Sequence, residues 1–334
     1  MMKLSLMSRV VATINEEHSS PLAHEIASRW FNDIKKVIYW RASSNFIFEV
    51  VTKQDSYVLR FNSINERSVD LIKAEVEVLN YLNDNGFSVC KPLKSLTGNY
   101  YELVDSNLGT FIAMVYKRIA GVMFEYHEIN EQQLKLWGAE LGKLHSALQN
   151  QVQLHNRPNW QDLMGFIKEH IKNNETQLLN EYHKIYEALS KLPVNENNYG
   201  LIHFDFETDN IIFNNNEISI IDFDDMCVLW FAADILYAVR SMFANEKIDI
   251  TNKDFNRFIE SYRLHKEVSD EELTLLPLFM RFHRLYLIAR LRRSLDITDF
   301  SQHPEWIEKL SNKVQQNYIQ SSIRDIENKV IHIR

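Results

Sequence analysis

Four residues suited to phosphate chemistry lie within residues 201–225, which read LIHFDFETDNIIFNNNEISIIDFDD. His203, Asp205 and Asn210 form the pattern H-x-D-x-x-x-x-N, and Asp222 follows on the next apolar segment. Two short strands joined by the turn NNNE would place Asn210 and Asp222 near each other. Their amide and carboxylate oxygens are hard ligands, which indicates a site for a divalent cation.

A divalent cation and a second carboxylate are the groups that phosphoryl transfer requires. Its transition state spreads negative charge over the γ-phosphoryl oxygens, magnesium neutralises that charge, and a carboxylate accepts a hydrogen bond from the attacking hydroxyl. Asp205 precedes Asn210 by five positions, which is the spacing of the catalytic-loop aspartate in kinases. The alternative is a hairpin whose acidic and amide groups only shape turns, and the layout of the rest of the chain disfavours it.

The elements that must position these residues divide the chain into a β-rich and a helical part. Residues 1–35 have a helical pattern, with Ser20 and Pro21 as a helix start. Strand-like composition follows in VIYWRASSNFIFEVV, YVLRF, YYELV and TFIAMVY, interrupted by one helical segment, LIKAEVEVLNYL. After Gly121 the pattern is helical except around residues 201–223. The catalytic pattern therefore lies where strands interrupt the helical half.

This pattern predicts an α+β fold of two lobes. The amino-terminal lobe is a small antiparallel β-rich unit with one internal helix, and the carboxy-terminal lobe is larger and mostly helical. We expect the first lobe to bind nucleotide and to span residues 1–113, with 1–35 as a helical extension. A hinge is predicted at residues 114–121, and residues 122–334 form the lobe with the catalytic loop and the acceptor site.

Composition excludes several other classes. The 334 residues are 45% hydrophobic, enough for a sizeable core, and the net charge of −8 with scattered basic residues disfavours nucleic-acid binding. Cys90 and Cys227 form neither a metal-ligand spacing nor a disulfide framework, which indicates a reducing compartment. Arg9 interrupts the apolar amino terminus, and no apolar run approaches the ~20 residues of a membrane span. We expect a cytoplasmic protein without a membrane partner; nothing indicates the oligomeric state.

Residues 201–225 resemble the catalytic segment of the aminoglycoside phosphotransferase and choline kinase-like superfamily, usually close to H-G-D-x-H-x-x-N and then I-D-[WF]-[ED]. GAELGKLH (Gly138–His145) is similar to the family's G-x-x-L-x-x-L-H helix, and FAADILYAV carries the aspartate of its next helix, Asp234. FIESYR (Phe258–Arg263) resembles a late helix that often reads F-x-x-G-Y. The resemblance covers roughly residues 40–290 and implies the two-lobe protein-kinase-like fold.

The resemblance implies a role for each residue of the catalytic segment. Asp205 is the base or the group that orients the hydroxyl. Asn210 and Asp222 are the metal ligands. His203 and Asp234 support the catalytic loop, with Asp234 accepting hydrogen bonds from the loop backbone. The alternatives are a hydrogen-bonded core histidine for His203 and an ordinary helix amino-terminal acid for Asp234.

The resemblance also implies a cation on a strand of the first lobe, paired with a glutamate on the internal helix. Arg60 in YVLRF and Glu75 in KAEVEVL match these positions. Arginine can bind phosphate or carboxylate oxygens in a bidentate manner. Glu77 is the rival partner, and helical periodicity favours Glu75, which lies along the apolar side of the helix.

The chain departs from the family pattern in three ways. The phosphate-covering loop has no glycine and offers backbone N–H groups and the side chains of Ser43, Ser44 and Asn45 instead. Phe204 replaces the usual glycine before the catalytic aspartate. Glu207 and Asp209 occupy positions that often hold histidine and glycine. These changes alter the wall of the site, so the identity of the acceptor does not follow from the resemblance.

The main hypothesis is a magnesium-dependent phosphotransferase that moves the γ-phosphoryl of ATP or GTP to a hydroxyl of a small molecule. A protein Ser/Thr kinase on the same fold is one alternative. A nucleotide-binding scaffold without turnover is another, and the presence of Asp205, Asn210 and Asp222 argues against it.

A surplus of acid near the catalytic loop indicates an amine-bearing acceptor, such as a cationic metabolite or an aminoglycoside-like antibiotic. Beyond the residues already given roles, the segment contains further acids, among them Glu207, Asp209, Asp224 and Asp225. The alternatives are that these acids face solvent, form turn hydrogen bonds or supply a second metal site.

Overall fold

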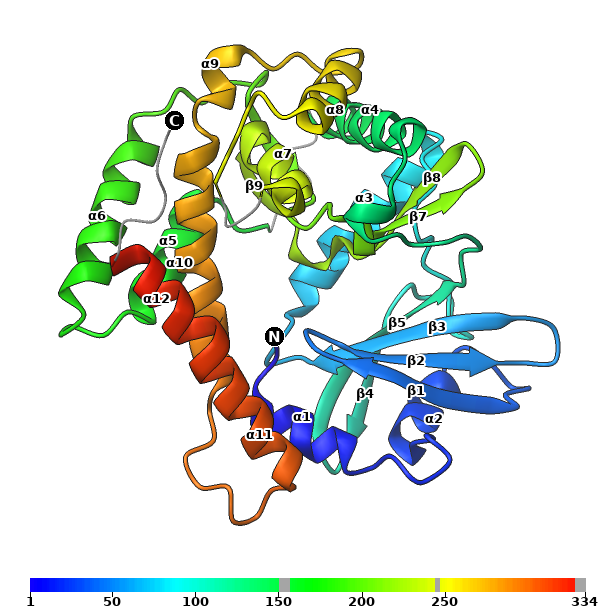
Figure 1. Cartoon of the computed structure of the whole chain (residues 1–334). Helices are drawn as coiled ribbons and strands as arrows, with labels where there is room; N and C mark the ends of the chain where they lie inside the picture. Colours follow the sequence, from blue (N-terminus) through cyan, green and yellow to red (C-terminus); the bar gives the residue numbers. More distant parts are fainter. Residues whose placement is uncertain (150–156, 244–246, 328–334) are drawn as a thin grey trace. The chain divides into compact units, whose positions relative to one another are not determined.

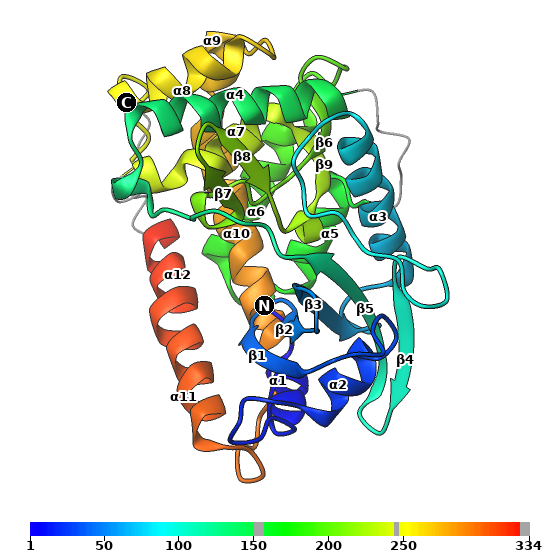
Figure 2. The same cartoon turned by 90° about the vertical axis from the view of Figure 1, so that its right-hand side faces the viewer.

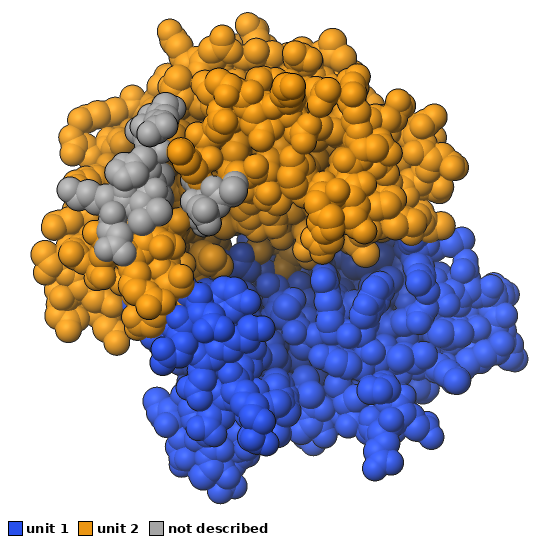
Figure 3. Space-filling model, in the orientation of Figure 1, with its two compact units in different colours: residues 1–84, 90–119, 290–318 blue, residues 85–89, 120–289, 319–334 orange. Residues whose placement is uncertain are grey.

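The computed structural model describes residues 1–149, 157–243 and 247–327, which form two compact units (Figure 3). Unit 1 comprises residues 1–84, 90–119 and 290–318, and unit 2 holds the other described residues. One boundary between the units falls after Ile119, among residues 114–121 of the predicted hinge, and residues 85–89 group with unit 2. Residues 290–318 differ from the predicted division, because they group with unit 1 rather than with the helical part.

Unit 1 is built on a five-stranded antiparallel sheet in the order β1-β2-β3-β5-β4 (Figure 1). The strands are β1 (Lys36–Ala42), β2 (Phe46–Val51), β3 (Ser56–Ser63), β4 (Glu102–Ser106) and β5 (Gly109–Lys117). Alternate residues of β2 face the core, because successive strand side chains point to opposite faces: Phe46, Phe48 and Val50 are fully buried. Phe61 of β3 stacks on both phenylalanines, with ring centroids 5.2 and 5.6 Å apart.

Helices complete the core of unit 1. Apolar residues of α1 (Leu4–Val11) and α2 (Pro21–Ala27) belong to the same buried cluster as the inner face of the sheet. As predicted, α2 begins after Ser20, whose hydroxyl accepts the N–H of Ala23 at 3.3 Å. The internal helix α3 (Val69–Asp84) is followed by Gly86 with φ +83°, a left-handed conformation that favours glycine. Carboxy-terminal residues add α11 (Glu305–Lys313).

Unit 2 is mostly helical and contains two short antiparallel strand pairs, β6–β9 and β7–β8. Its strands are β6 (Tyr199–Ile202), β7 (Ile211–Asn214), β8 (Glu217–Ile220) and β9 (Cys227–Trp230). Its helices are α4 (Glu131–Leu148), α5 (Trp160–Glu169), α6 (Thr176–Ser190), α7 (Phe231–Val239), α8 (Lys253–Arg263), α9 (Asp270–Leu273) and α12 (Gln320–Glu327). Helix α10 (Leu276–Ser294) begins in unit 2, and its last residues belong to unit 1.

The predicted α+β class is confirmed by this sequence of elements, β-rich first and helical afterwards. Between residues 36 and 51 the structure has two strands and a turn, where composition alone gave one continuous β-rich stretch. Among the helices of the described residues, none is both long and apolar enough to cross a membrane.

Helices α4 and α8 run side by side (Figures 1 and 2), and two glycines allow their close approach. A Cβ atom on Gly138 would lie 2.2 Å from the carbonyl oxygen of Phe258, and one on Gly142 would lie 2.5 Å from that of Tyr262. Neither distance is tolerable for carbon against a backbone oxygen. The glycines of the GAELGKLH segment are therefore packing residues that bring the backbone of α4 onto α8.

Gly138→Ala is expected to lower the free energy of unfolding by about 1–3 kcal/mol, because a backbone would have to move to admit the methyl group. Gly165→Ala in α5 is the matched control, since no atom lies within 4 Å of its added Cβ. Alanine favours a helix interior by about 0.5–1 kcal/mol, so this control should be slightly stabilised. Chemical denaturation measures both, and equal effects in the two variants would contradict the close packing of α4 on α8.

Candidate active site

The catalytic segment follows the ends of short strands in unit 2. Strand β6 ends just before His203, and β7 begins just after Asn210. The N–H of Ile221 donates to the carbonyl of Asn210 at 3.1 Å, which closes the β7–β8 hairpin at the end where Asp222 follows. Asn210 and Asp222 thus lie at the same end of one hairpin, the arrangement that the sequence predicts.

Asp205 is held by Asn210. The side-chain amide nitrogen of Asn210 donates to the Asp205 carbonyl at 2.9 Å and to its Oδ2 at 3.1 Å. Asn210 is buried, whereas the side chain of Asp205 is 38% exposed. Because the amide nitrogen is used on Asp205, the amide oxygen is the atom that Asn210 can offer to a cation. The carboxylate of Asp205 is fixed in position and still reachable from solvent.

His203 braces the same loop from within the core. Its Nδ1 accepts the N–H of Asp205 at 3.3 Å, so its Nε2 carries the proton and donates to the carbonyl of Ile221 at 3.0 Å. The ring is fully buried and packs edge-on against Phe206 and Phe223. The imidazole therefore links the loop that carries Asp205 to the residue before Asp222.

Asp234 is a fully buried carboxylate on α7 that binds the loop backbone. Its Oδ2 accepts the N–H of His203 at 3.0 Å, and its Oδ1 accepts the N–H of Phe204 at 2.8 Å. Its Oδ2 also lies 2.9 Å from Nε2 of His145, whose Nδ1 lies 2.8 Å from the hydroxyl of Tyr262. The backbone hydrogen bonds expected of Asp234 are present, and they continue as a buried chain to α4 and α8.

The imidazole of His145 in this hydrogen-bonded path is neutral at neutral pH. Burial lowers the pKa of His145, and the neighbouring Asp234 carboxylate only partly opposes that effect. Burial likewise raises the pKa of the Tyr262 hydroxyl well above its usual range. With both groups neutral, Tyr262 donates to Nδ1 and His145 donates through Nε2 to Asp234, so each polar atom on this path has a partner.

Asp222 stands in an unusual backbone conformation. It has φ +64° and ψ +58°, the left-handed region that non-glycine residues rarely adopt. The turn Phe223–Asp225 follows immediately, so the chain reverses just after the strand. Within the described residues, no group of three or more His, Cys, Asp or Glu side chains is arranged to hold a metal ion. The side-chain oxygens of Asn210 and Asp222 are of the hard type that magnesium prefers, and magnesium commonly keeps several waters and takes phosphate oxygens as further ligands.

Arg240 binds two of the acids beside the loop, and sequence patterns did not single it out. Its Nη2 lies 2.5 Å from Glu207 Oε2 and 3.7 Å from Asp205 Oδ1, while Nη1 lies 2.7 Å from Nε2 of His283. Burial raises the pKa of Glu207 to about 6, against the opposing effect of the guanidinium. Burial alone would lower the pKa of Arg240, but Glu207, Asp205 and Asp209 raise it. The Glu207–Arg240 pair is therefore ionised at neutral pH.

The other three acids considered for acceptor binding, Asp209, Asp224 and Asp225, have different surroundings. Asp209 is exposed, and Asp225 is partly buried. Asp224 is only 4% exposed, and its carbonyl accepts a hydrogen bond from Arg157 at 2.8 Å. Of these acids, Asp209 is the one most open to an external cation.

Arg60 and Glu75 meet in unit 1, as predicted. Nη2 of Arg60 lies 2.6 Å from Oε2 of Glu75, and their side chains are 7% and 1% exposed. Tyr116 donates to the other carboxylate oxygen at 3.4 Å and lies under the guanidinium, 5.4 Å from ring centroid to Cζ. Glu77, the rival partner, is exposed. The contact is confirmed, and it fixes the guanidinium on β3.

The glycine-free loop at residues 43–45 is the turn between β1 and β2. None of its residues has a positive φ, so this turn does not need glycine. Asn62 on β3 donates through Nδ2 to the carbonyl of Ser44 at 2.6 Å and to Oδ1 of Asn45 at 3.1 Å. The loop is thus held by a side chain of the neighbouring strand.

A model of the phosphotransferase enzyme family matches residues 40–265. The chain belongs to this family. Amicoumacin kinase of Bacillus subtilis (strain 168) is 25% identical to this phosphotransferase over 297 residues, covering 85% of this chain and 88% of that protein.

Solved structures share the fold of this phosphotransferase. An amicoumacin kinase in complex with AMP-PNP, Ca2+ and Ami has a TM-score of 0.77 at 22% identity, with 96% of each chain covered. A microcompartment-associated aminopropanol kinase has a TM-score of 0.70 at 18% identity, covering 92% of this chain and 97% of that one. These likenesses confirm the predicted kinase-like fold class.

Phe204 is the most unusual residue of this phosphotransferase loop. It replaces the usual glycine and adopts φ +73°, a left-handed conformation that costs a residue with a side chain roughly 1–2 kcal/mol. Its ring is 4% exposed and packs edge-on against Tyr237 and Tyr286, with centroids 5.0 and 5.3 Å away. Burial of an aromatic ring with such contacts is worth enough to offset the backbone cost.

The buried chain through His145 predicts acid sensitivity of folding. The folded pKa of His145 lies below its ordinary value of 6.5, so below that pH the unfolded chain binds a proton that the folded chain excludes. The contribution of neutral His145 to the free energy of unfolding is fully present above about pH 6.5. It is lost as pH falls, by up to about 1.4 kcal/mol per pH unit. Urea denaturation between pH 7.5 and 5 measures this loss.

His145→Gln is the comparison variant. It should be less stable than the wild type at pH 7.5, yet the difference between the two should shrink as pH falls, because glutamine does not titrate. Parallel stability curves for the two proteins would show that His145 takes no part in the acid sensitivity.

Proposed function

We propose that this chain transfers the γ-phosphoryl group of ATP to a hydroxyl of a small molecule, with Asp205 as the base. The observation that carries the proposal is the hydrogen-bonded pair of Asp205 and Asn210 at the hairpin end where Asp222 follows. Membership of the phosphotransferase enzyme family supports the same reaction class.

Asp205 would accept the proton of the acceptor hydroxyl as the hydroxyl oxygen bonds to the γ-phosphorus and the bond to the bridging oxygen breaks, which releases ADP. The carboxylate is already oriented by Asn210, so little conformational entropy is lost when the acceptor binds. The guanidinium of Arg240, 3.7 Å from Oδ1, favours the ionised carboxylate that a base requires. Asp234 and His203 would act indirectly, because they bind the backbone N–H groups of His203 and Asp205 and so position the loop.

Asn210 and Asp222 would hold Mg2+, which supplies charge neutralisation at the phosphates when it is bound. An oxygen from each residue is a ligand of the right hardness. The amicoumacin kinase solved with Ca2+ and AMP-PNP supports a divalent cation and an adenine nucleotide for this fold. ATP is therefore the donor that we propose, with GTP as the alternative.

Arg60, Glu75 and the loop Ser43, Ser44 and Asn45 would bind the phosphates of the nucleotide. The buried Glu75 carboxylate holds the guanidinium of Arg60 in one position, and a pre-positioned cation loses little entropy on binding an anion. The two serine hydroxyls add donors suited to phosphate oxygens.

An amine-bearing acceptor is the substrate class that we propose. The negative charge of Glu207 is offset by Arg240, so Glu207 attracts a cationic acceptor less than its sequence position indicates. Asp209 is exposed and carries the attraction for an ammonium group in this proposal. A likeness in fold to an aminopropanol kinase, named for an amino alcohol, supports the same class.

Asp205→Asn is expected to reduce the turnover number by about 10²–10⁴-fold, because the amide cannot take the hydroxyl proton. Nucleotide affinity should hardly change. Magnesium-dependent ATP consumption with a saturating acceptor measures the first quantity, and calorimetric titration measures the second. Asp249→Asn, at an exposed acid far along the chain, serves as the control. Turnover within a few-fold of the wild type would remove Asp205 from the role of base.

The acceptor class can be tested with matched pairs, after a panel of amino alcohols, aminoglycosides, sugars, macrolides and a generic protein substrate has identified an acceptor. Replacing its amine by a hydroxyl should lower kcat/KM about 10-fold or more at low salt, because an acidic site concentrates cations. Asp209→Asn should lower kcat/KM for the amine and leave the neutral analogue unaffected. Equal efficiency with both acceptors would exclude recognition of the positive charge.

A further inference from the structure

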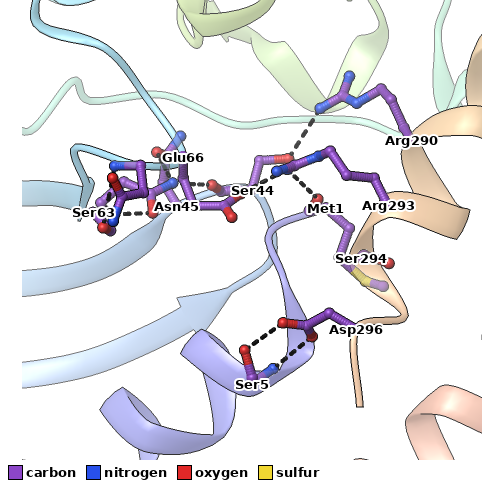
Figure 4. A network of polar contacts seen from close by, with 12 residues as sticks. Met1, Ser5, Ser44, Asn45, Ser63, Glu66, Arg290, Arg293, Ser294 and Asp296 are labelled. Carbon is purple, nitrogen blue, oxygen red and sulfur yellow. Dashed lines mark hydrogen bonds and ion pairs between the residues drawn. The ribbon is translucent and has the colours of Figure 1, made fainter. Parts of the chain in front are cut away.

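Arg290, near the end of α10, reaches the glycine-free loop of residues 43–45. Its Nη2 lies 3.4 Å from Oγ of Ser44 (Figure 4). Both residues belong to unit 1, although they are 246 positions apart in the chain. A positive charge therefore stands beside the hydroxyl that the loop offers to phosphate.

Most backbone polar groups of the loop form hydrogen bonds within the protein. The N–H of Ser43 donates to the carbonyl of Asn45 at 3.2 Å, and the carbonyl of Ser43 accepts the N–H of Met2 at 2.8 Å. Asn62 binds the carbonyl of Ser44. A glycine-rich loop binds phosphate mainly through backbone N–H groups. In this loop the N–H group of Ser43 is bound to the carbonyl of Asn45, so at least one backbone N–H group is not available to phosphate.

The end of α10 is anchored in unit 1, so Arg290 is held beside the loop. Arg293, one helical turn later, pairs with Glu66 at 2.6 Å and donates to the carbonyl of Met1 at 3.4 Å. Asp296 accepts the N–H of Ser5 at 3.0 Å, just beyond the helix (Figure 4). Glu66 offsets the charge of Arg293.

We propose that Arg290 binds the phosphates of the nucleotide together with Ser44, and that its charge replaces donors that a glycine-rich loop would supply. The ligand class is a nucleoside di- or triphosphate. A guanidinium can bind two phosphate oxygens at once, which suits this position. The inference rests on the proposed function, since it requires that the loop covers the phosphates.

Arg290→Gln tests the charge directly. Glutamine retains an N–H donor for Ser44 but carries no charge. If the contact with Ser44 only supports the loop, the variant should therefore bind nucleotide like the wild type. Calorimetric titration with magnesium and ATP, ADP or AMP should show affinity for ATP and ADP falling about 10-fold or more, as expected for loss of a charge-assisted contact of about 1.5–3 kcal/mol. AMP affinity should change much less. Arg290→Lys should recover part of the loss.

Arg29→Gln is the matched control, because it removes an arginine charge from an exposed position of unit 1. It should bind all three nucleotides like the wild type. Equal loss of affinity for ATP, ADP and AMP in Arg290→Gln, or no loss at all, would overturn the role of Arg290. If the wild-type protein bound none of the three nucleotides, the proposed function itself would fail, and that outcome is distinct from the first two.

Discussion

The catalytic segment depends on one buried carboxylate. Asp234 has no exposed surface and accepts hydrogen bonds from two successive backbone N–H groups and from His145. An ionised group in the core is tolerated only when its oxygens are fully used, and removing its partners leaves a charge that costs several kcal/mol. This requirement couples the loop, α4 and α8. The glycine contacts between the two helices matter because they bring Tyr262 within reach of His145.

The site also balances its own charge. Five acidic residues lie between positions 205 and 222, and their carboxylates would repel one another if nothing offset their charge. Arg240 offsets it from α7's carboxy-terminal end by binding Glu207 and approaching Asp205. Asn210 contributes in another way, since it donates to Asp205 without adding charge. The carboxylate of Asp205 therefore stands among other acids without unopposed repulsion.

Sequence patterns predicted the contacts between residues that are close together in the sequence or lie in the same helix or hairpin. Helical periodicity selected Glu75 over Glu77, and the turn between two short strands placed Asn210 beside the segment that carries Asp222. Arg240, His283 and Arg290 escaped prediction because their partners lie 33 to 246 positions away, and no periodicity links them. Phe204 stood out only as a departure from a family pattern. Its compensation, packing against Tyr237 and Tyr286, requires the tertiary structure.

The composition of unit 1 from three separate stretches of chain has a consequence for biosynthesis. The strands of its sheet are synthesised before residues 120–289, and residues 290–318 are synthesised after them. At ordinary elongation rates this interval is on the order of ten seconds. During that time the sheet exists without the helix end that carries Arg290 and Arg293. We therefore expect unit 1 to finish folding late in synthesis, and its exposed strands to be the part of the nascent chain that chaperones engage.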